Sequence, residues 1–186
     1  MQSTAPIFKV GSTQIKLLDA IQRSVFLKKK LIDCTLQFLN GSNVRVENEF
    51  YKVESLIGSG LIGTVYKVKQ EENGKFYALK HVRANFEFYR QSLKIELNTS
   101  HLIARELNHL KVIPIHLTTN RFMLKEYCEL PTLQSIIYNK TINESHISKL
   151  ESVLNDCLIL FEKHNILVDL SPKNIVWDGK NWFLID

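Results

Sequence analysis

The sequence has few of the features that are typical of secreted proteins, of proteins stabilised by a structural metal, or of membrane proteins. Its three cysteines, Cys34, Cys128 and Cys157, lie far apart and form no CxxC pair. This spacing argues against a structural zinc site and a disulfide framework, so we expect a reducing, cytoplasmic-type environment. No apolar run approaches the ~18–20 residues that span a membrane. Residues 1–14 lack the charged and apolar regions of a secretory signal peptide.

The sequence also lacks a basic stripe of the kind that binds nucleic acid. Lys and Arg number 24 against 19 Asp and Glu, a net charge of +5, but aromatic residues do not alternate with the basic ones. Since that alternation is typical of nucleic-acid recognition, we expect no nucleic-acid partner. Hydrophobic residues make up 45% and charged residues 23% of the chain, which is ordinary for a globular protein.

Residues 1–49 are predicted to form an N-terminal extension that is partly helical. Apolar residues recur at helical spacing across Ile15–Phe38, interrupted by the basic run Lys28–Lys30. Such a helix can pack on the domain with its lysines in solvent, or it can dock on a membrane surface or a partner. Both alternatives stay open. Gly41-Ser42-Asn43 predicts a turn.

Residues 50–129 have the pattern of a β-sheet with one helix. The predicted strands lie on both sides of a glycine turn within Tyr51–Lys69 and at Phe76–Val82, Val112–Ile115 and Phe122–Tyr127, and the helix lies at Phe86–Leu110. Glu72–Lys75 predicts a hairpin turn. The sequence therefore predicts a five-stranded sheet with one helix.

Residues 130–186 are predicted to be mainly helical up to Leu167. Ile147–His164 carries a broad apolar face. A short loop at Asp169–Asn174 and a hairpin at Ile175–Ile185 follow. Together with the preceding strands, this order indicates an α+β fold in two lobes, 50–129 and 130–186.

A glycine motif joins the first two predicted strands of the domain. Gly58, Gly60 and Gly63 form a GxGxxGxV pattern that ends at Val65. Because glycine has no Cβ, the backbone there can approach phosphate groups closely. The motif alone is a weak signal, and a plain hairpin turn is the alternative. Its place between two strands, rather than between a strand and a helix, argues against a dinucleotide site.

Lys80 lies in a strand that is otherwise largely apolar. In a cleft its ammonium would bind phosphate oxygens as a point charge, whereas on an edge strand it would be solvated. A lysine held in a cleft needs a carboxylate, and the next helix offers Glu96 and Glu106. We favour Glu96, because Glu106 falls near the predicted helix end, where we expect it to be solvated.

A third group of candidate site residues lies near the C-terminal end of the sequence. Asp169 and Asn174 form a DxxxxN pattern, and Asp186 follows the apolar run Trp182–Ile185. A carboxylate buried there would be costly without a partner, and a metal ion would supply one. Asn174 and Asp186 offer the hard oxygen ligands that Mg²⁺ takes. Asp169 is then free to accept a hydroxyl proton; an Asx-rich turn is the alternative.

The order and spacing of these motifs, from Tyr51 to Asp186, resemble the protein kinase family. The resemblance implies a two-lobed protein-kinase-like fold that uses ATP and Mg²⁺. It implies catalytic roles for Asp169, Lys80 and Glu96, and a metal site at Asn174 and Asp186. It further implies a set of nucleotide contacts: Ile57, Gly58, Gly60, Gly63, Val65, Ala78, Lys80, Val176, and backbone groups at Glu126 and Cys128.

The sequence departs from the family's pattern at several positions. Val168 stands where the family usually has Arg before the catalytic Asp. Ser171 replaces a lysine common in Ser/Thr kinases, and we expect Lys173 to take over its catalytic role. Lys125 occupies a position beside the adenine site where an apolar residue is usual. No Phe-Gly or activation segment follows Asp186, so either the sequence is truncated or the protein is a minimal kinase with a much reduced helical C-lobe.

The resemblance implies an active protein kinase that transfers the γ-phosphoryl group of ATP to a protein hydroxyl, on Ser or Thr rather than Tyr. In brevity the chain resembles compact bacterial kinases of the HopBF-like group, which type III secretion delivers into host cells. It would then be a secreted virulence effector acting on a host protein such as a chaperone, and we expect a monomer. Two alternatives stay open: a pseudokinase that acts as a binding module, and a small-molecule phosphotransferase related to aminoglycoside kinases.

Overall fold

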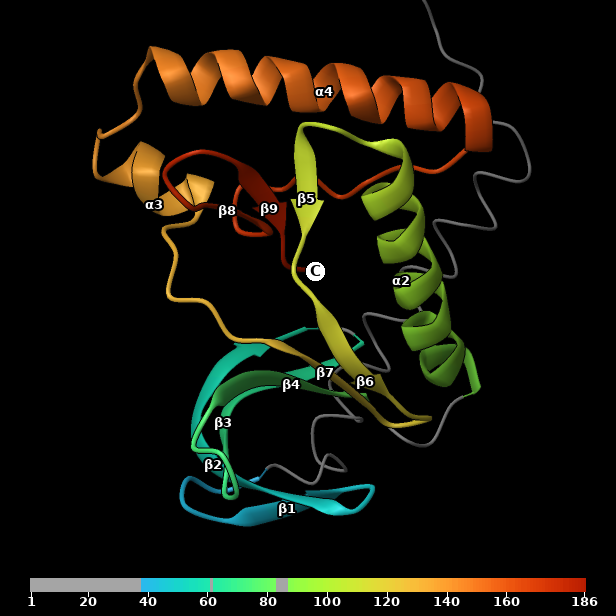
Figure 1. Ribbon diagram of the computed structural model, residues 1–186, viewed down its shortest axis with the longest axis vertical. Coiled ribbons are helices and arrows are strands. Elements are labelled where there is room, and N and C mark those ends of the chain that lie inside the picture. The colour runs from blue at the N-terminus through green and yellow to red at the C-terminus, as the bar shows by residue number, and fades with distance from the viewer. Residues whose placement is uncertain (1–37, 61, 83–86) are drawn as a thin grey trace, which may run out of the picture. The chain divides into compact units, whose positions relative to one another are not determined.

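The computed structural model describes residues 38–60, 62–82 and 87–186, and within them two β-sheets and three helices can be followed (Figure 1). The helix predicted at Ile15–Phe38 lies outside the described residues, apart from Phe38 itself. None of the described helices is both long enough and apolar enough to cross a membrane.

The larger sheet is antiparallel, and its six strands run in the order β1-β2-β3-β4-β7-β6. The strands are β1 Asn43–Val46, β2 Glu49–Ser59, β3 Gly63–Gln70, β4 Phe76–Val82, β6 Ile115–Thr118 and β7 Phe122–Glu126. The predicted bounds of β4 are confirmed, and so is the turn before it, where Gly74 has a φ of 70°. Glycine adopts this left-handed backbone conformation at little cost.

The prediction of five strands for this sheet is wrong, because β1 was not recognised. The predicted turn exists, with Gly41 at a φ of 81°, but Asn43 already begins a strand that pairs with β2. Val44 and Val46 are buried and alternate with exposed neighbours, a pattern too short to stand out in the sequence. The predicted domain start at residue 50 lies inside the β1–β2 hairpin.

The two faces of the larger sheet pack against different partners. On one face Tyr66 and Leu79 belong to a buried cluster to which the β1–β2 hairpin also contributes. On the other face Val82 and Met123 pack with Leu93 of helix α2, which spans Glu87–Glu106. The second face is therefore the one that α2 covers.

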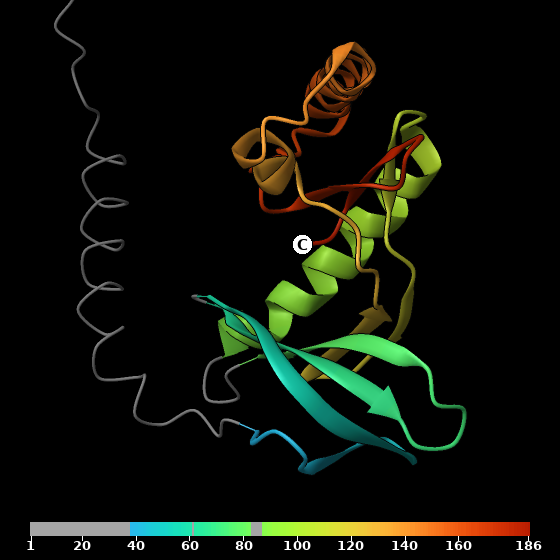
Figure 2. The same cartoon turned by 90° about the vertical axis from the view of Figure 1, so that its left-hand side faces the viewer.

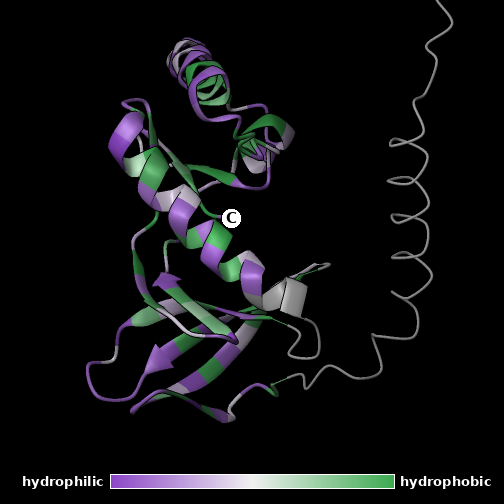
Figure 3. Cartoon of the chain, turned by 90° about the vertical axis from the view of Figure 1, so that its right-hand side faces the viewer, coloured by the Kyte–Doolittle hydropathy of each residue, from purple (hydrophilic) through white to green (hydrophobic). Residues whose placement is uncertain are grey.

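Helix α2 ends earlier than predicted, because the next strand, β5 (Leu110–Val112), begins where the helix was expected to continue. The predicted strand at Val112–Ile115 is in fact divided between β5 and β6, which belong to different sheets. Pro114 separates them, since proline has no N–H to donate to a strand ladder. In Figure 3, hydrophobic and hydrophilic bands alternate along α2, as a helix with one packed face requires.

The smaller sheet has the order β5-β9-β8, with β8 at Ile175–Trp177 and β9 at Trp182–Leu184. The predicted hairpin is confirmed, and Gly179 in its turn has a φ of 96°. Strand β9 also pairs in parallel with β5, with Leu110 opposite Trp182, which the sequence did not predict. Trp182 is 0% exposed and lies in the second core with Leu160. This core anchors the strand that leads to Asp186.

Two helices, α3 (Leu133–Tyr138) and α4 (Glu144–His164), pack against the smaller sheet (Figure 2). Asn143 caps the first turn of α4, which therefore begins earlier than predicted, and Asn165 ends the helix with a φ of 54°. The predicted broad apolar face is only partly buried. Val153 is fully buried, whereas Leu154 and Leu158 are 47% and 60% exposed.

Candidate active site

Strand register places predicted nucleotide-binding residues on one face of the larger sheet. Val65 lies opposite Lys80 in the β3–β4 pair, and Ala78 lies opposite Lys125 in the β4–β7 pair. Cross-strand partners share a face, and so do residues two positions apart. Met123, opposite Lys80, packs with α2. All of these side chains therefore belong to the face that α2 covers.

The glycine turn between β2 and β3 contains glycines with different structural roles. The Gly60 N–H donates to the Gly63 carbonyl at 2.9 Å and closes the turn. A Cβ on Gly63 would lie 2.3 Å from the His81 carbonyl oxygen, so the spacing between β3 and β4 requires glycine there. A Cβ on Gly60 would meet no atom within 4 Å. The space over Gly60 is therefore open to a group from outside the protein.

The residues predicted to surround adenine differ in burial. Ile57 on β2 is 45% exposed, Val65 and Ala78 are half-buried, and Val176 on β8 is 2% exposed. Gly58 lies opposite Val65 in the β2–β3 register. The predicted adenine site therefore takes residues from β2, β3, β4 and β8.

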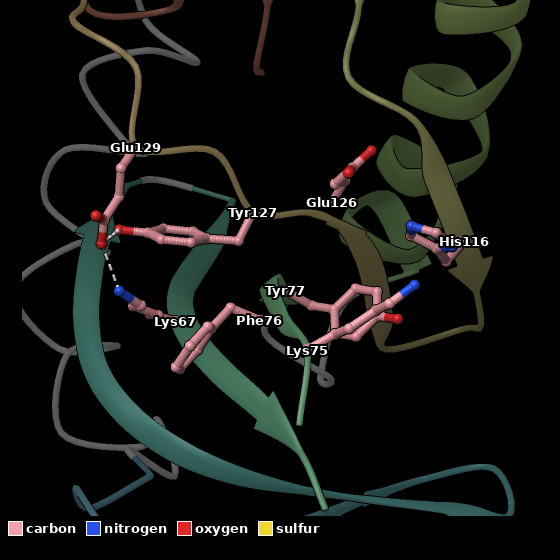
Figure 4. Close-up of a pocket in the computed structure, with 8 residues that line it drawn as sticks. All are labelled: Lys67, Lys75, Phe76, Tyr77, His116, Glu126, Tyr127 and Glu129. Atoms are coloured by element: carbon pink, nitrogen blue, oxygen red, sulfur yellow. Dashed lines mark hydrogen bonds and ion pairs between the residues drawn. The ribbon is translucent and has the colours of Figure 1, made fainter. Parts of the chain in front are cut away.

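The end of β7 and the segment that follows it were predicted to bind adenine through backbone groups at Glu126 and Cys128. Glu126 lies opposite Tyr77, so its side chain belongs to the sheet face opposite Lys80. Figure 4 shows it lining a pocket of about 540 Å³ whose lining residues do not include Lys80. This placement is consistent with a backbone role for Glu126. Cys128 is half-buried, and burial raises the pKa of its thiol.

Lys67 on β3 contacts two residues of the segment that follows β7. The Lys67 ammonium donates to Glu129 at 2.6 Å and lies 4.4 Å from the centre of the Tyr127 ring (Figure 4). The Tyr127 hydroxyl also reaches Glu129, at 3.3 Å. These contacts link the segment after β7 to the larger sheet.

Lys80 is buried and bound by two carboxylates. Its Nζ donates to Glu96 Oε2 at 2.7 Å and also contacts Asp186 Oδ1. Burial alone would lower the pKa of this ammonium, but the charges of Glu96 and Asp186 outweigh burial and raise the pKa. The structure thus brings Lys80 to Glu96, the partner favoured from the sequence.

Glu106, the rival carboxylate, has other partners. Lys163 of α4 donates to it at 2.5 Å and Arg105 at 3.1 Å. The Lys163 contact, followed by the Arg105 contact, lowers the pKa of Glu106 to about 2. The expectation that Glu106 is simply solvated was wrong, since it links α2 to α4.

The loop at 169–174 orients its polar ends toward each other. Asp169 accepts the Ser171 N–H at 3.0 Å on one oxygen and the Asn174 amide N–H at 2.9 Å on the other. The Asn174 carbonyl in turn accepts the Ile185 N–H at 2.9 Å. The loop is therefore tied to the residue directly before Asp186. Lys173 is exposed, as is Asp169, but unlike Asp169 it does not line the cavity described below.

Asp186 is more open than the sequence argument required. Its side chain is 49% exposed and contacts Lys80, so the expectation that this carboxylate is buried is wrong. The donor atoms nevertheless fit Mg²⁺. Asn174 uses its amide nitrogen on Asp169, which leaves the amide oxygen, and Asp186 adds a carboxylate. Mg²⁺ usually takes one or two protein oxygens and completes its shell with water and phosphate.

Lys125 is a site residue whose role the sequence analysis missed. It is 8% exposed, and its Nζ donates to Glu96 Oε1 at 2.5 Å and to the Ile185 carbonyl at 2.8 Å. The signal was present in the sequence, because Lys125 follows the apolar residues of β7 just as Lys80 follows those of β4. A lysine that directly follows an apolar run is the same signal that indicated a cleft position for Lys80.

One cavity of about 300 Å³ joins these groups. It is lined by residues from α2, β4, β7, the 169–174 loop and the C-terminal segment, among them Lys80, Glu96, Lys125, Asp169, Asn174 and Asp186. Of the described residues, none of the predicted adenine contacts lines this cavity. The cavity thus corresponds to the phosphate and metal end of the predicted site.

A family model for the protein kinase domain matches residues 51–186. The chain belongs to the protein kinase family. Among curated relatives, this kinase-family chain is 24% identical over 155 residues to human calcium/calmodulin-dependent protein kinase type IV. It is 28% identical over 170 residues to the mouse interferon-induced, double-stranded RNA-activated protein kinase. The two matches cover 75% and 77% of this chain, which spans only 30% of each relative's length.

Solved kinase domains share the fold of this kinase-family chain. The BubR1 kinase domain aligns with a TM-score of 0.57 at 19% identity, covering 92% of this chain and 59% of that one. The PknI kinase domain of Mycobacterium tuberculosis aligns with a TM-score of 0.54 at 17% identity, covering 81% and 62%. At these identities the likeness concerns the fold.

Proposed function

We propose that this protein is an ATP- and Mg²⁺-dependent protein kinase that phosphorylates Ser or Thr hydroxyls. The observation that carries the proposal is the cavity in which Lys80, Glu96, Asp169, Asn174 and Asp186 converge from four separate segments. Phosphoryl transfer needs little covalent chemistry from the protein and depends on positioning and charge stabilisation. These residue types supply both.

The nucleotide end of the site would be served by the glycine turn and Lys80. Open space over Gly60 gives phosphate oxygens access to the backbone. The Lys80 ammonium, oriented by Glu96 at 2.7 Å, supplies a positive charge to the phosphates. Asn174 and Asp186 would hold Mg²⁺, which when bound neutralises charge that develops on the transferred group.

Asp169 would accept the proton of the acceptor hydroxyl. Its carboxylate is exposed and lines the cavity, so an acceptor can reach it from solvent. The Ser171 N–H and the Asn174 amide hold both oxygens in place. A base fixed in this way meets the hydroxyl without a rotamer search. The preference for Ser and Thr rests on relatives such as the Drosophila serine/threonine-protein kinase fused, 28% identical over 137 residues.

The test is an incubation of the purified chain with labelled ATP, Mg²⁺, casein and a small-molecule hydroxyl acceptor such as kanamycin. We expect label on Ser or Thr of casein, reduced ~10²–10⁴-fold by Asp169→Asn. Asp178→Asn is the matched control, because Asp178 caps the β8–β9 turn outside the cavity. Label on kanamycin alone would indicate a small-molecule phosphotransferase. Binding of ATP without transfer to any acceptor would indicate a pseudokinase that acts as a binding module.

A further inference from the structure

Lys125 carries its charge into the interior of the protein. It follows the apolar residues Phe122–Leu124 on β7 and lies on the sheet face that also carries Lys80. Its side chain is 10% exposed. Removal of an ammonium from water is costly unless partners replace the water, and loss of one partner leaves an uncompensated charge. The contacts of Lys125 are therefore ones that the fold has to maintain.

These contacts join three segments that are distant in the sequence. From β7, Lys125 reaches Glu96 on α2 at 2.5 Å and the Ile185 carbonyl, next to Asp186, at 2.8 Å. The Ile185 N–H is bound to Asn174. Lys125 thus restrains the helix that carries Glu96 and the backbone that carries Asp186.

Glu96 divides its two oxygens between two lysines. Oε1 accepts from Lys125 and Oε2 from Lys80, so the carboxylate cannot rotate without losing one of these charge-assisted bonds. The cluster contains two ammonium groups and, with Asp186, two carboxylates. Its charges therefore balance, and loss of Lys125 would leave a net negative charge where a polyphosphate is to bind.

We propose that Lys125 is a positioning residue: it holds Glu96 and the Ile185–Asp186 backbone so that Glu96 orients Lys80. The inference rests on the proposed kinase function and deepens it. In kinases the strand lysine and the helix glutamate must be paired for transfer, and control of the helix is a common means of regulation. Here Lys125, a side chain of the same domain, maintains the pairing of Lys80 with Glu96.

The kinetic test compares Lys125→Met, of similar size but neutral, with Lys125→Arg and with Lys111→Met. Lys111 is an exposed lysine on β5 and serves as the control. We expect Lys125→Met to lower kcat about 10–100-fold, the scale of a small misplacement of reacting groups. KM for the protein acceptor and the activity of Lys111→Met should not change, and Lys125→Arg should recover most of kcat. Lys125→Met with wild-type kcat overturns the proposal.

Coupling to Glu96 is the second kinetic readout. If Lys125 acts through Glu96, the double variant Lys125→Met/Glu96→Ala should be slower than Glu96→Ala by much less than the factor that Lys125→Met costs on its own, and the remainder would come from the lost Ile185 contact. Losses that multiply in the double variant would show that Lys125 acts independently and would overturn the proposal.

A labelling experiment separates this inference from the proposed function. Lysines of the intact chain are acetylated, and the rate at each is read by mass spectrometry, with circular dichroism as the check on folding. Lys125 should be protected relative to Lys111, and Glu96→Ala should raise the acetylation rate of Lys125 about tenfold or more, as expected for loss of a charge-assisted bond.

A second variant covers the case in which Glu96→Ala does not fold, and Glu96→Gln then replaces it. Its single amide oxygen can retain only one lysine, so the summed labelling of Lys80 and Lys125 should rise. If the wild-type chain transfers no phosphate, the proposed function fails and labelling alone decides. Increased labelling supports the proposal that Lys125 is held by Glu96, and unchanged protection overturns it.

Discussion

Gly63 and Gly60 should respond in opposite ways to the same substitution. In Gly63→Ala, the new Cβ would lie 2.3 Å from the His81 oxygen, 3.0 Å from its carbonyl carbon and 3.1 Å from Val82 Cα. All three are backbone atoms of β4, so no side chain can turn away, and β3 must move from its partner. Overpacking of this kind costs ~1–3 kcal/mol. At ~2–4 °C per kcal/mol for a chain of this size, we expect Tm to fall by ~2–12 °C.

Gly60→Ala adds the same methyl group where no atom lies within 4 Å. The backbone of Gly60 is not in the left-handed region, so alanine fits without strain. Tm should therefore stay the same or rise slightly, because alanine restricts the unfolded chain more than glycine does. If phosphates approach this backbone, the methyl group should raise KM for ATP about tenfold while Tm is maintained.

The assay is thermal unfolding of wild type, Gly60→Ala and Gly63→Ala with and without Mg²⁺-ATP, followed by steady-state kinetics. An unchanged Tm for Gly63→Ala would refute the close β3–β4 spacing. A Gly60→Ala protein with wild-type Tm and wild-type KM would refute the idea that the open space admits phosphate.

Three further predictions concern charge. Asp186→Ala should lower phosphoryl transfer ~10²-fold or more, with no recovery at high Mg²⁺, and transfer that persists in this variant or in excess chelator would contradict the proposed metal site. The raised pKa of Lys80 means that its contribution to stability is complete below ~pH 10.4 and is lost as pH rises through the higher folded value. Melting curves of wild type and Lys80→Met should therefore converge in strong alkali, and curves that stay equally far apart would count against the ion pairs. Because Lys163 and Arg105 lower the pKa of Glu106 to about 2, its contribution is present above ~pH 4.3 and is lost as pH falls toward 2, so Glu106→Gln should melt below wild type at pH ~6 but not at pH ~2.

The elements that the sequence predicted well have local causes. β4 is bounded by a glycine turn whose φ of 70° only a few residue types adopt readily, and its alternation is long enough to recognise. The partnership of Lys80 and Glu96 followed from the position of a strand lysine before a helix. The DxxxxN loop also folds on itself, as Asp169 accepts hydrogen bonds from Ser171 and Asn174.

The features that escaped prediction depend on contacts between distant segments. Nothing near Asp186 in the sequence shows that Lys80 supplies its partner and that half of its side chain is exposed. Lys125 stands after an apolar run that is visible in the sequence, but its partners, Glu96 and the Ile185 carbonyl, lie far from it along the chain. The division of Val112–Ile115 between two sheets required the parallel pairing of β5 with β9, for which the sequence has no local signal.

The parallel pairing of β5 with β9 also sets an order of events during synthesis. All six strands of the larger sheet have been translated once Glu126 is made, so that sheet can assemble as the chain leaves the ribosome. Leu110, in contrast, has to wait for Trp182, and closing so long a loop is slow. The groups that would bind nucleotide can thus be in place well before Asp186 reaches them. A chain interrupted before β9 would retain Lys80, Glu96 and Asp169 but would lack Asp186, the second carboxylate that contacts Lys80.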